Sequence, residues 1–198
     1  MSNFHLHAKP FVDKLKVNSS IILEIGSERG EGSTAWFDSI ANDHWVDFYS
    51  VDITDFASKT LSHLRHTTFV IAKSGAEWTK KELPKLKKQI KILYLDNYDW
   101  ISTMDNIRPA EQKLIDEYNA MGVKMSNFDC QREHLEQMIN CMPYMHDQSL
   151  VICDDTPYSE SAGVYFGKNG PVIPYLIIHG YKIVYSGNNG CILARGIK

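Results

Sequence analysis

Short apolar runs recur along the chain, and most of them end at an acidic residue or a glycine. The first covers residues 20–25 (SIILEI) and leads into a glycine-rich turn. Runs of this length that are apolar throughout are typical of strands buried on both faces of a parallel sheet. The same pattern predicts further strands at 47–53, 68–72, 91–95 and 149–153, and a final pair of strands within 175–195.

The segments between these runs have helical spacing. They cover residues 33–40, 58–65, 77–90, 109–121 and 126–142. Alternating strands and helices predict an α/β fold with a mostly parallel, Rossmann-like sheet, right-handed crossovers and helices on both faces. The Gly-Asn-Asn-Gly turn at 187–190 predicts that the last two strands form an antiparallel C-terminal hairpin.

The chain shows no internal repeat and no linker, so we expect a single domain over residues 1–198. The segment 100–147 is longer than one crossover requires. Long insertions at the ligand-binding edge of such sheets are usually functional, and we expect a helical lid there.

Composition excludes several classes of protein. The net charge of −3 argues against a nucleic-acid partner, because duplex-binding domains usually carry a basic surplus. No apolar stretch exceeds four residues, as in 69–72 and 150–153, which is far shorter than the ~20 residues of a membrane span. The first residues lack the pattern of a secretory signal, and the four cysteines have no zinc spacing. We therefore expect a cytoplasmic protein with free, mostly buried thiols that acts on a small molecule, with homo-oligomerisation left open.

The turn after the first strand reads EIGSERGEGST and contains Gly26, Gly30 and Gly32. Glycine permits a tight turn and a close backbone approach to a ligand, and a helix starting at Ser33 directs its free N–H groups to the same place. Asp52 ends the second strand 20 residues beyond Gly32 (52 − 32), where an acid that binds ribose hydroxyls is expected. Together these residues predict an adenosine-nucleoside site.

The charge around this turn discriminates between nucleosides. Glu24, Glu28 and Glu31 would repel a pyrophosphate but attract a sulfonium and an ammonium group. This favours S-adenosylmethionine over NAD(P). A short-chain oxidoreductase remains an alternative because its glycine spacing is similar, although none of the ten tyrosines has the required lysine four residues later. A non-catalytic nucleoside-binding module is a further alternative.

The run ILEIGSERGEGST, with Asp52 closing the next strand, resembles motif I of the class I S-adenosylmethionine-dependent methyltransferases. The Glu-x-Gly-xxx-Gly spacing is similar to that of the catechol-type and macrolide-sugar O-methyltransferases. The resemblance covers roughly residues 20–195 and implies a seven-stranded sheet whose last strand is antiparallel. The cofactor-binding residues that it implies are Glu24, Gly26, Gly30, Gly32, Ser33, Asp52, Ser74 and Asp96.

Acids also follow the fourth and fifth predicted strands, as Asp96 and as the pair Asp154 and Asp155. The ends of neighbouring parallel strands meet, so these carboxylates should cluster and need a proton or a cation between them. Mg²⁺ would satisfy that need. The resemblance to metal-dependent O-methyltransferases makes all three candidate ligands, although Asp96 and Asp155 could instead only cap turns.

The resemblance implies O-methylation of a hydroxyl on a sugar, a polyol or a natural product, with the metal lowering the hydroxyl's pKa. The general base stays open. The catechol-type enzymes have a lysine three residues after the first metal ligand, whereas this chain has Asp99 there. Asp96, Asp99, Tyr98 and His134 are the candidate catalytic residues, and Lys168 is a candidate for holding an acidic group of the substrate.

Overall fold

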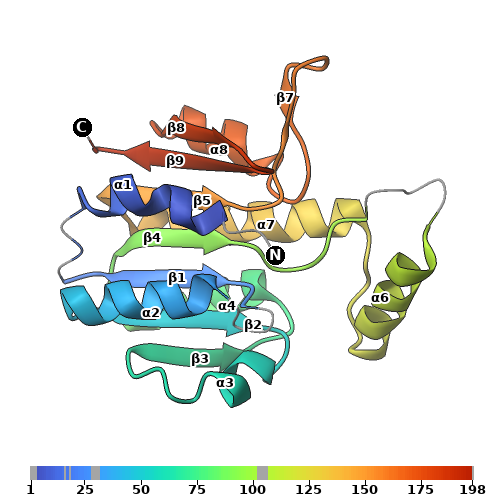
Figure 1. Ribbon diagram of the computed structural model, residues 1–198, viewed down its shortest axis with the longest axis horizontal. Coiled ribbons are helices and arrows are strands. Elements are labelled where there is room, and N and C mark those ends of the chain that lie inside the picture. The colour runs from blue at the N-terminus through green and yellow to red at the C-terminus, as the bar shows by residue number, and fades with distance from the viewer. Residues whose placement is uncertain (1–3, 16, 18, 28–31, 102–106, 198) are drawn as a thin grey trace.

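The computed structural model describes residues 4–15, 17, 19–27, 32–101 and 107–197. A seven-stranded sheet with strand order β3-β2-β1-β4-β5-β9-β8 forms its centre (Figure 1). The strands are β1 (Ile21–Ile25), β2 (Asp47–Asp52), β3 (Thr67–Ile71), β4 (Ile90–Leu95), β5 (Met145–Cys153), β8 (Lys182–Gly187) and β9 (Gly190–Arg195).

The directions of the strands confirm the predicted fold class. β1, β2, β3, β4 and β5 pair in parallel, while β9 runs antiparallel to both β5 and β8. Asn188 and Asn189 between β8 and β9 both have a positive φ, of 50° and 63°. This is the conformation of a type I′ turn, and the antiparallel hairpin that the sequence predicted here is confirmed.

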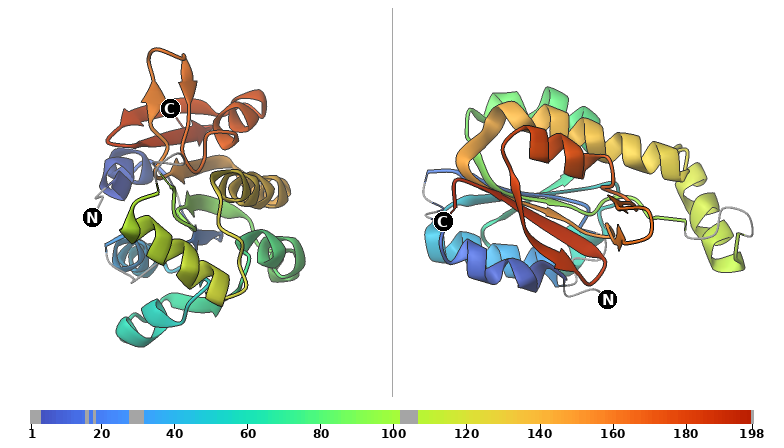
Figure 2. Two further views of the ribbon diagram at one scale, coloured as in Figure 1. Left: turned by 90° about the vertical axis from the view of Figure 1, so that its right-hand side faces the viewer. Right: turned by 90° about the horizontal axis from the view of Figure 1, so that it is seen from above.

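Helices cover both faces of the sheet (Figure 2). One face carries the 3-10 helix η1 (Phe4–Ala8), α1 (Lys9–Val12) and α2 (Ser33–His44); the other carries α4 (Gly75–Lys81), α5 (Leu83–Leu86), α7 (Asn127–Cys141) and α8 (Val172–Ile178). Strand residues alternate between the two layers, as the pleat requires. Ile22 and Ile92 pack with Phe37 on the α2 face, whereas Leu23 and Leu93 belong to the core on the α7 face.

Two predicted helices differ from those observed. The segment 77–90 forms α4 and α5 instead of one helix, because Pro84 lies in the first turn of α5 and cannot continue a helix begun upstream. The segment 58–65 forms the earlier and shorter α3 (Phe56–Thr60). A small hairpin of β6 (Tyr158–Ser159) and β7 (Val164–Tyr165) was not predicted, since strands of two residues leave no periodic signal.

The predicted insertion at 100–147 divides into two parts. α6 (Pro109–Ala120) projects beyond the carboxyl ends of the strands (Figure 1) and packs in a small separate cluster through Tyr118, with Ile101 and Met125. α7 instead belongs to the main core through Met138 and Cys141. The part that stands off the sheet is therefore α6, and its motion as a lid stays a prediction.

Two expectations about side chains and helices can be compared with the described residues. All four cysteines are free and buried, as predicted. Within the described part of the chain, no helix combines the length and the apolar character needed to span a bilayer.

Candidate active site

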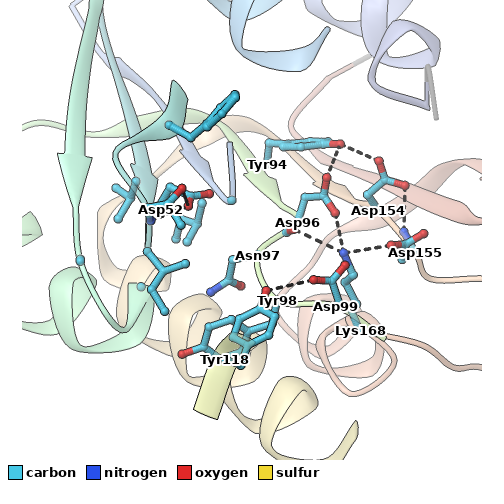
Figure 3. A pocket seen from close by; sticks show the side chains of 18 of the residues that line it. Asp52, Tyr94, Asp96, Asn97, Tyr98, Asp99, Tyr118, Asp154, Asp155 and Lys168 are labelled. Carbon is cyan, nitrogen blue, oxygen red and sulfur yellow. Dashed lines mark hydrogen bonds and ion pairs between the residues drawn. The ribbon is translucent and has the colours of Figure 1, made fainter. Parts of the chain in front are cut away.

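A cavity of about 600 Å³ opens at the carboxyl edge of the sheet, between the strand ends and α6. Its walls come from the ends of β1, β2, β4 and β5 and from the loop before α8. Figure 3 shows Asp52 on one side of the cavity and a cluster of Asp96, Asp154, Asp155 and Lys168 on the other. The topology therefore brings the predicted acids at the ends of these strands to one edge.

Gly26 begins the turn at the end of β1 and has φ of +98°. A Cβ at this position would lie 2.3 Å from the backbone N of Asn97, so no other residue fits without a shift of the backbone. The neighbouring backbone bonds Gly26 N to Val51 O (2.8 Å) and Asp96 N to Ile25 O (2.9 Å). Gly26 is thus closely packed between the ends of β2 and β4 while it lines the cavity.

Asp52 ends β2 and lines the cavity, as expected for a ribose-binding acid. Its Oδ2 accepts a hydrogen bond from the backbone N of Ser27 at 2.8 Å, and its Oδ1 accepts from the backbone N of Thr54 at 2.9 Å. These bonds fix the carboxylate beside the turn that follows β1.

Of the other predicted cofactor-binding residues, some line the cavity and others do not. Ser33 lines the cavity, and Gly32 immediately precedes α2 with φ of +89°. Ser74 instead caps α4 and donates to Glu133 Oε1 at 2.9 Å, although its neighbours Lys73 and Gly75 line the cavity. Gly30 lies outside the described residues. The structure therefore brings Gly26, Ser33, Asp52 and Asp96 to the wall of one cavity.

Glu24 is fully buried beneath this wall and is not part of the lining. Its Oε2 accepts from Ser50 Oγ at 2.7 Å and from Thr34 Oγ1 at 2.8 Å, which joins β1 to β2 and α2. Burial raises the pKa of Glu24 to about 7, against the opposing effect of these hydroxyl donors. A direct contact between Glu24 and a cofactor stays a prediction.

Lys168 lies at the centre of the acidic cluster, with 5% of its side chain exposed. Its Nζ is 2.9 Å from Asp96 Oδ1 and 2.9 Å from Asp155 Oδ2. On the other side of Asp96, the hydroxyl of Tyr94 donates to Asp154 Oδ2 at 2.6 Å and lies 3.2 Å from Asp96 Oδ2. Figure 3 shows these contacts as one connected network.

The pKa values in the cluster follow from burial and charge. Burial and, to a smaller extent, the nearby charge of Asp96 together raise the pKa of Asp154 to about 7. Burial also raises the pKa of Asp96, opposed by the charge of Lys168. Burial would lower the pKa of Lys168, but the charges of Asp96 and Asp155 outweigh it and hold that pKa well above its ordinary value. Lys168 is therefore an ammonium cation at neutral pH.

The magnesium site predicted at Asp96, Asp154 and Asp155 does not fit this arrangement. The ammonium group of Lys168 already occupies the space between two of the three carboxylates. A divalent ion in contact with both would meet that ammonium at short range and be repelled by it. Among the described residues, no group of three or more His, Cys, Asp or Glu side chains is arranged to hold a metal. The sequence predicted that these acids need a proton or a cation among them, and Lys168 supplies a cation between Asp96 and Asp155.

The candidate bases occupy different surroundings. Asp99 lines the cavity, and its Oδ2 accepts from the hydroxyl of Tyr118 at 3.0 Å. Tyr98 also lines the cavity but donates to the backbone oxygen of Lys73 at 3.0 Å, and burial raises its pKa. Asp99 is thus the candidate with a carboxylate at the cavity wall.

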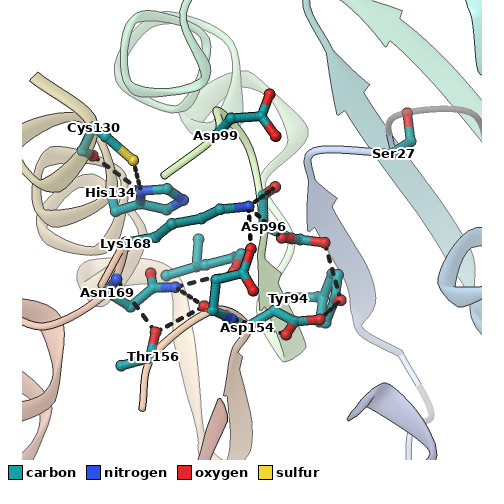
Figure 4. Close-up of polar contacts among 12 residues, drawn as sticks. Ser27, Tyr94, Asp96, Asp99, Cys130, His134, Asp154, Thr156, Lys168 and Asn169 are labelled. Atoms are coloured by element: carbon teal, nitrogen blue, oxygen red, sulfur yellow. Dashed lines mark hydrogen bonds and ion pairs between the residues drawn. The ribbon is translucent and has the colours of Figure 1, made fainter. Parts of the chain in front are cut away.

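His134 is fully buried in α7 and lies outside the cavity lining. Its Nδ1 lies 2.9 Å from the backbone oxygen of Cys130, which identifies Nδ1 as the protonated nitrogen (Figure 4). Burial lowers the pKa of His134 to about 3. The ring is therefore neutral at ordinary pH. It lies near Lys168 but is not part of the cavity lining.

Sequence reasoning missed several lining residues, including Tyr94, Asn97, Tyr118 and His5. Tyr94 precedes Asp96 by two residues on one strand, a spacing that puts both side chains on the same face and could have found it. His5 had no comparable signal. The η1 helix brings it, nearly buried, to the cavity, where its ring lies 5.4 Å from that of Trp36.

Solved structures with the same fold are class I S-adenosylmethionine-dependent methyltransferases. The carbon methyltransferase CurJ aligns with 100% of this chain and 54% of its own, with a TM-score of 0.57 and 9% identity. CalS11, a TDP-rhamnose 3'-O-methyltransferase of calicheamicin biosynthesis, aligns over 96% of this chain and 78% of its own, with a TM-score of 0.53 and 10% identity.

A third example is the N-methyltransferase NodS from Bradyrhizobium japonicum, solved with S-adenosylhomocysteine. It aligns over 97% of this chain and 86% of its own, with a TM-score of 0.50 and 11% identity. No protein-family model matches the chain, and no curated protein matches its sequence significantly. The chain therefore has the class I methyltransferase fold, a fold on which carbon, nitrogen and oxygen are all methylated.

Proposed function

We propose that this protein is an S-adenosylmethionine-dependent methyltransferase that methylates a hydroxyl group of a small molecule, such as a sugar, a polyol or a natural product. The observation that carries this proposal is the division of one cavity into two ends. Gly26 and Asp52 form a nucleoside-type end, and Asp96, Asp99 and Lys168 form a polar end. Methyl donor and acceptor would occupy these ends respectively.

The lining suits S-adenosylmethionine better than a dinucleotide. The cavity volume of about 600 Å³ falls within the usual range for ligand pockets. The lining includes six carboxylates but two lysines, which favours a ligand with sulfonium and ammonium groups over one with a pyrophosphate. Asn97 Oδ1 is buried without a hydrogen-bond partner among the described residues and could accept from that ammonium group.

The residues at the polar end would orient the acceptor and move its proton. Bound S-adenosylmethionine supplies a methyl group made electrophilic by the sulfonium. The acceptor oxygen forms a bond to the methyl carbon, the carbon–sulfur bond breaks, and its electron pair stays on sulfur. The hydroxyl proton passes to the carboxylate of Asp99 at the cavity wall. Holding both reactants next to each other in one cavity would supply much of the rate.

Lys168 favours a hydroxyl over an amine as the acceptor. Its ammonium group would repel a protonated amine but donate readily to an oxygen. The resemblance to the TDP-rhamnose 3'-O-methyltransferase CalS11 is compatible with a sugar hydroxyl. Magnesium has no part in this proposal, for the reason given above. The absence of a nucleic-acid partner and a cytoplasmic location stay predictions.

Calorimetry followed by a transfer assay tests the proposal. S-adenosylmethionine, S-adenosylhomocysteine and NAD(P) are titrated into the protein, and transfer of a labelled methyl group is then measured across sugars, polyols and catechols. Binding of S-adenosylmethionine with transfer to at least one hydroxyl is the expected result. Binding of NAD(P) instead would contradict it and favour the oxidoreductase. Cofactor binding without transfer across the panel would contradict it too and favour a non-catalytic module.

A further inference from the structure

Lys168 is held rigidly at the cavity by the loop that precedes α8. Its backbone N donates to Asp155 O at 3.0 Å. Gly167 beside it has φ of +79°, and a Cβ there would lie 2.0 Å from Asp155 O, so the loop packs directly on the end of β5. Asn169 donates through Nδ2 to Leu95 O (3.2 Å) and to Asp154 O (3.0 Å), which joins the loop to the ends of β4 and β5.

The ammonium group has two strong contacts and one weak one. Two of its N–H groups are directed to Asp96 Oδ1 and Asp155 Oδ2, both at 2.9 Å. The remaining contact, to the backbone oxygen of Asp96, is 3.4 Å long. This is near the limit of a hydrogen bond, so a better oxygen acceptor from a ligand could replace it. Since Lys168 lines the cavity, such an oxygen can reach it.

The ammonium group of Lys168 lies among the acids for which the sequence predicted a divalent ion. Metal-dependent O-methyltransferases, which the sequence resembles, hold a divalent ion with acids at the ends of these same two strands. Here three acids occupy those ends, and the ammonium group of Lys168 lies between two of them. The protein therefore keeps the acids and supplies the positive charge from its own chain.

We propose that Lys168 takes the place of the divalent ion and is the acceptor-binding cation of this enzyme. It donates its remaining N–H to the oxygen that is methylated and stabilises the negative charge that develops there. This inference rests on the proposed methyltransferase function. It further specifies the acceptor class as a neutral or anionic oxygen nucleophile, and it makes transfer independent of added metal.

Substitution of Lys168 tests the inference with a readout that does not need activity. Removing the ammonium group leaves Asp96 and Asp155, both 2.9 Å from Nζ in the wild type, without the cation between them, and a divalent ion can then bind in its place. Mn²⁺ alone is titrated at pH 8 into wild type, Lys168→Met, Lys168→Arg and the control Lys85→Met, and bound Mn²⁺ is followed by electron paramagnetic resonance. Lys85 is exposed on α5 and pairs with Glu82, outside the cavity lining.

We expect at least ~10-fold tighter Mn²⁺ binding by Lys168→Met than by wild type, Lys168→Arg or Lys85→Met. Methyl transfer by wild type should be unaffected by EDTA and should fall at least ~100-fold in Lys168→Met through kcat. Its affinity for S-adenosylmethionine should change less than 10-fold. Lys168→Gln replaces Lys168→Met if the latter does not fold.

Tight Mn²⁺ binding by wild type, or no gain in the folded variant, would overturn the inference. So would loss of wild-type transfer in EDTA, or unchanged transfer in Lys168→Met. If wild type does not bind S-adenosylmethionine at all, the proposed function fails, while the Mn²⁺ titration still reports on the place of Lys168. The two failures are thus distinguishable.

Discussion

The backbone N of Ser27 donates a hydrogen bond to Asp52 Oδ2 at 2.8 Å, which joins the turn after β1 to the end of β2. The contact spans 25 residues of sequence. It orients the carboxylate that we expect to bind the ribose of the methyl donor, and it fixes the turn against which that donor would lie.

Asp52→Ala should weaken the binding of S-adenosylmethionine by about 10- to 100-fold, because a hydrogen bond to a charged group contributes ~1.5–3 kcal/mol. Isothermal titration calorimetry measures this directly. Asp43→Ala, which changes an exposed acid on α2, is the matched control and should bind as wild type does. Equal affinities for Asp52→Ala and the control would remove Asp52 from the site.

Gly26→Ala should destabilise the protein by ~3 kcal/mol or more. The new Cβ would combine a left-handed φ of +98° with a backbone atom of Asn97 at 2.3 Å. Gly163→Ala is the control, since Gly163 has φ of +67° but a Cβ there would lie 4.0 Å from its nearest neighbour, the hydroxyl of Tyr158. Urea unfolding should give a loss of only ~1 kcal/mol for this control. Similar losses in both variants would show that the close approach to Asn97 costs little.

The buried Glu24 should make stability depend on pH. Its pKa is raised from 4.5 to about 7 in the folded protein, so the folded state binds its proton more tightly than the unfolded state does. The contribution of Glu24 to the free energy of unfolding is therefore complete below pH 4.5 and is lost as the pH rises through 7. Glu24→Gln lacks this titration, so the variant should gain stability relative to wild type over that interval, by at most ~3 kcal/mol.

Comparison of wild type with Glu24→Gln separates the titration of Glu24 from that of other groups that titrate in the same pH range. Burial lowers the pKa of His5 to about 4 and that of His134 to about 3, and these two rings destabilise the fold at low pH instead. Wild type and Glu24→Gln both contain these two histidines, so their effect cancels in the difference between the two free energies of unfolding. Urea unfolding at pH 5, 6, 7 and 8 measures that difference. A difference that stays constant with pH would be evidence against a titrating Glu24.

α6 should be the least protected of the long helices against hydrogen exchange. It packs in a small cluster with Ile101 and Met125, separate from the main core, whereas the end of α7 packs in that core. Peptides from 109–120 should exchange faster than those from 135–141, and adding S-adenosylhomocysteine should slow the former. If the ligand binds and exchange in 109–120 is unchanged, α6 is not a lid over the donor.

Much of the architecture could be predicted from the sequence. The fully apolar runs predicted the central strands, and the Gly-Asn-Asn-Gly turn predicted the β8–β9 hairpin, because periodicity and turn chemistry are local properties. The rule that ligands bind at the carboxyl ends of parallel strands then placed Asp52, Asp96 and Asp154 at one edge. The strands and the hairpin depend on residues close together in the chain, and the general rule for parallel sheets related the distant acids to one another.

The tertiary structure alone decided what neutralises the acidic cluster and which predicted residues face the cavity. Lys168 is 72 residues from Asp96, and no periodicity or spacing relates the two. Glu24 accepts a hydrogen bond from Ser50, 26 residues further along the chain, and His134 is fully buried in α7, so neither side chain lines the cavity. The sequence predicted that these acids need a proton or a cation among them, since like charges repel. Only the path of the chain in space determined that the cation is a lysine.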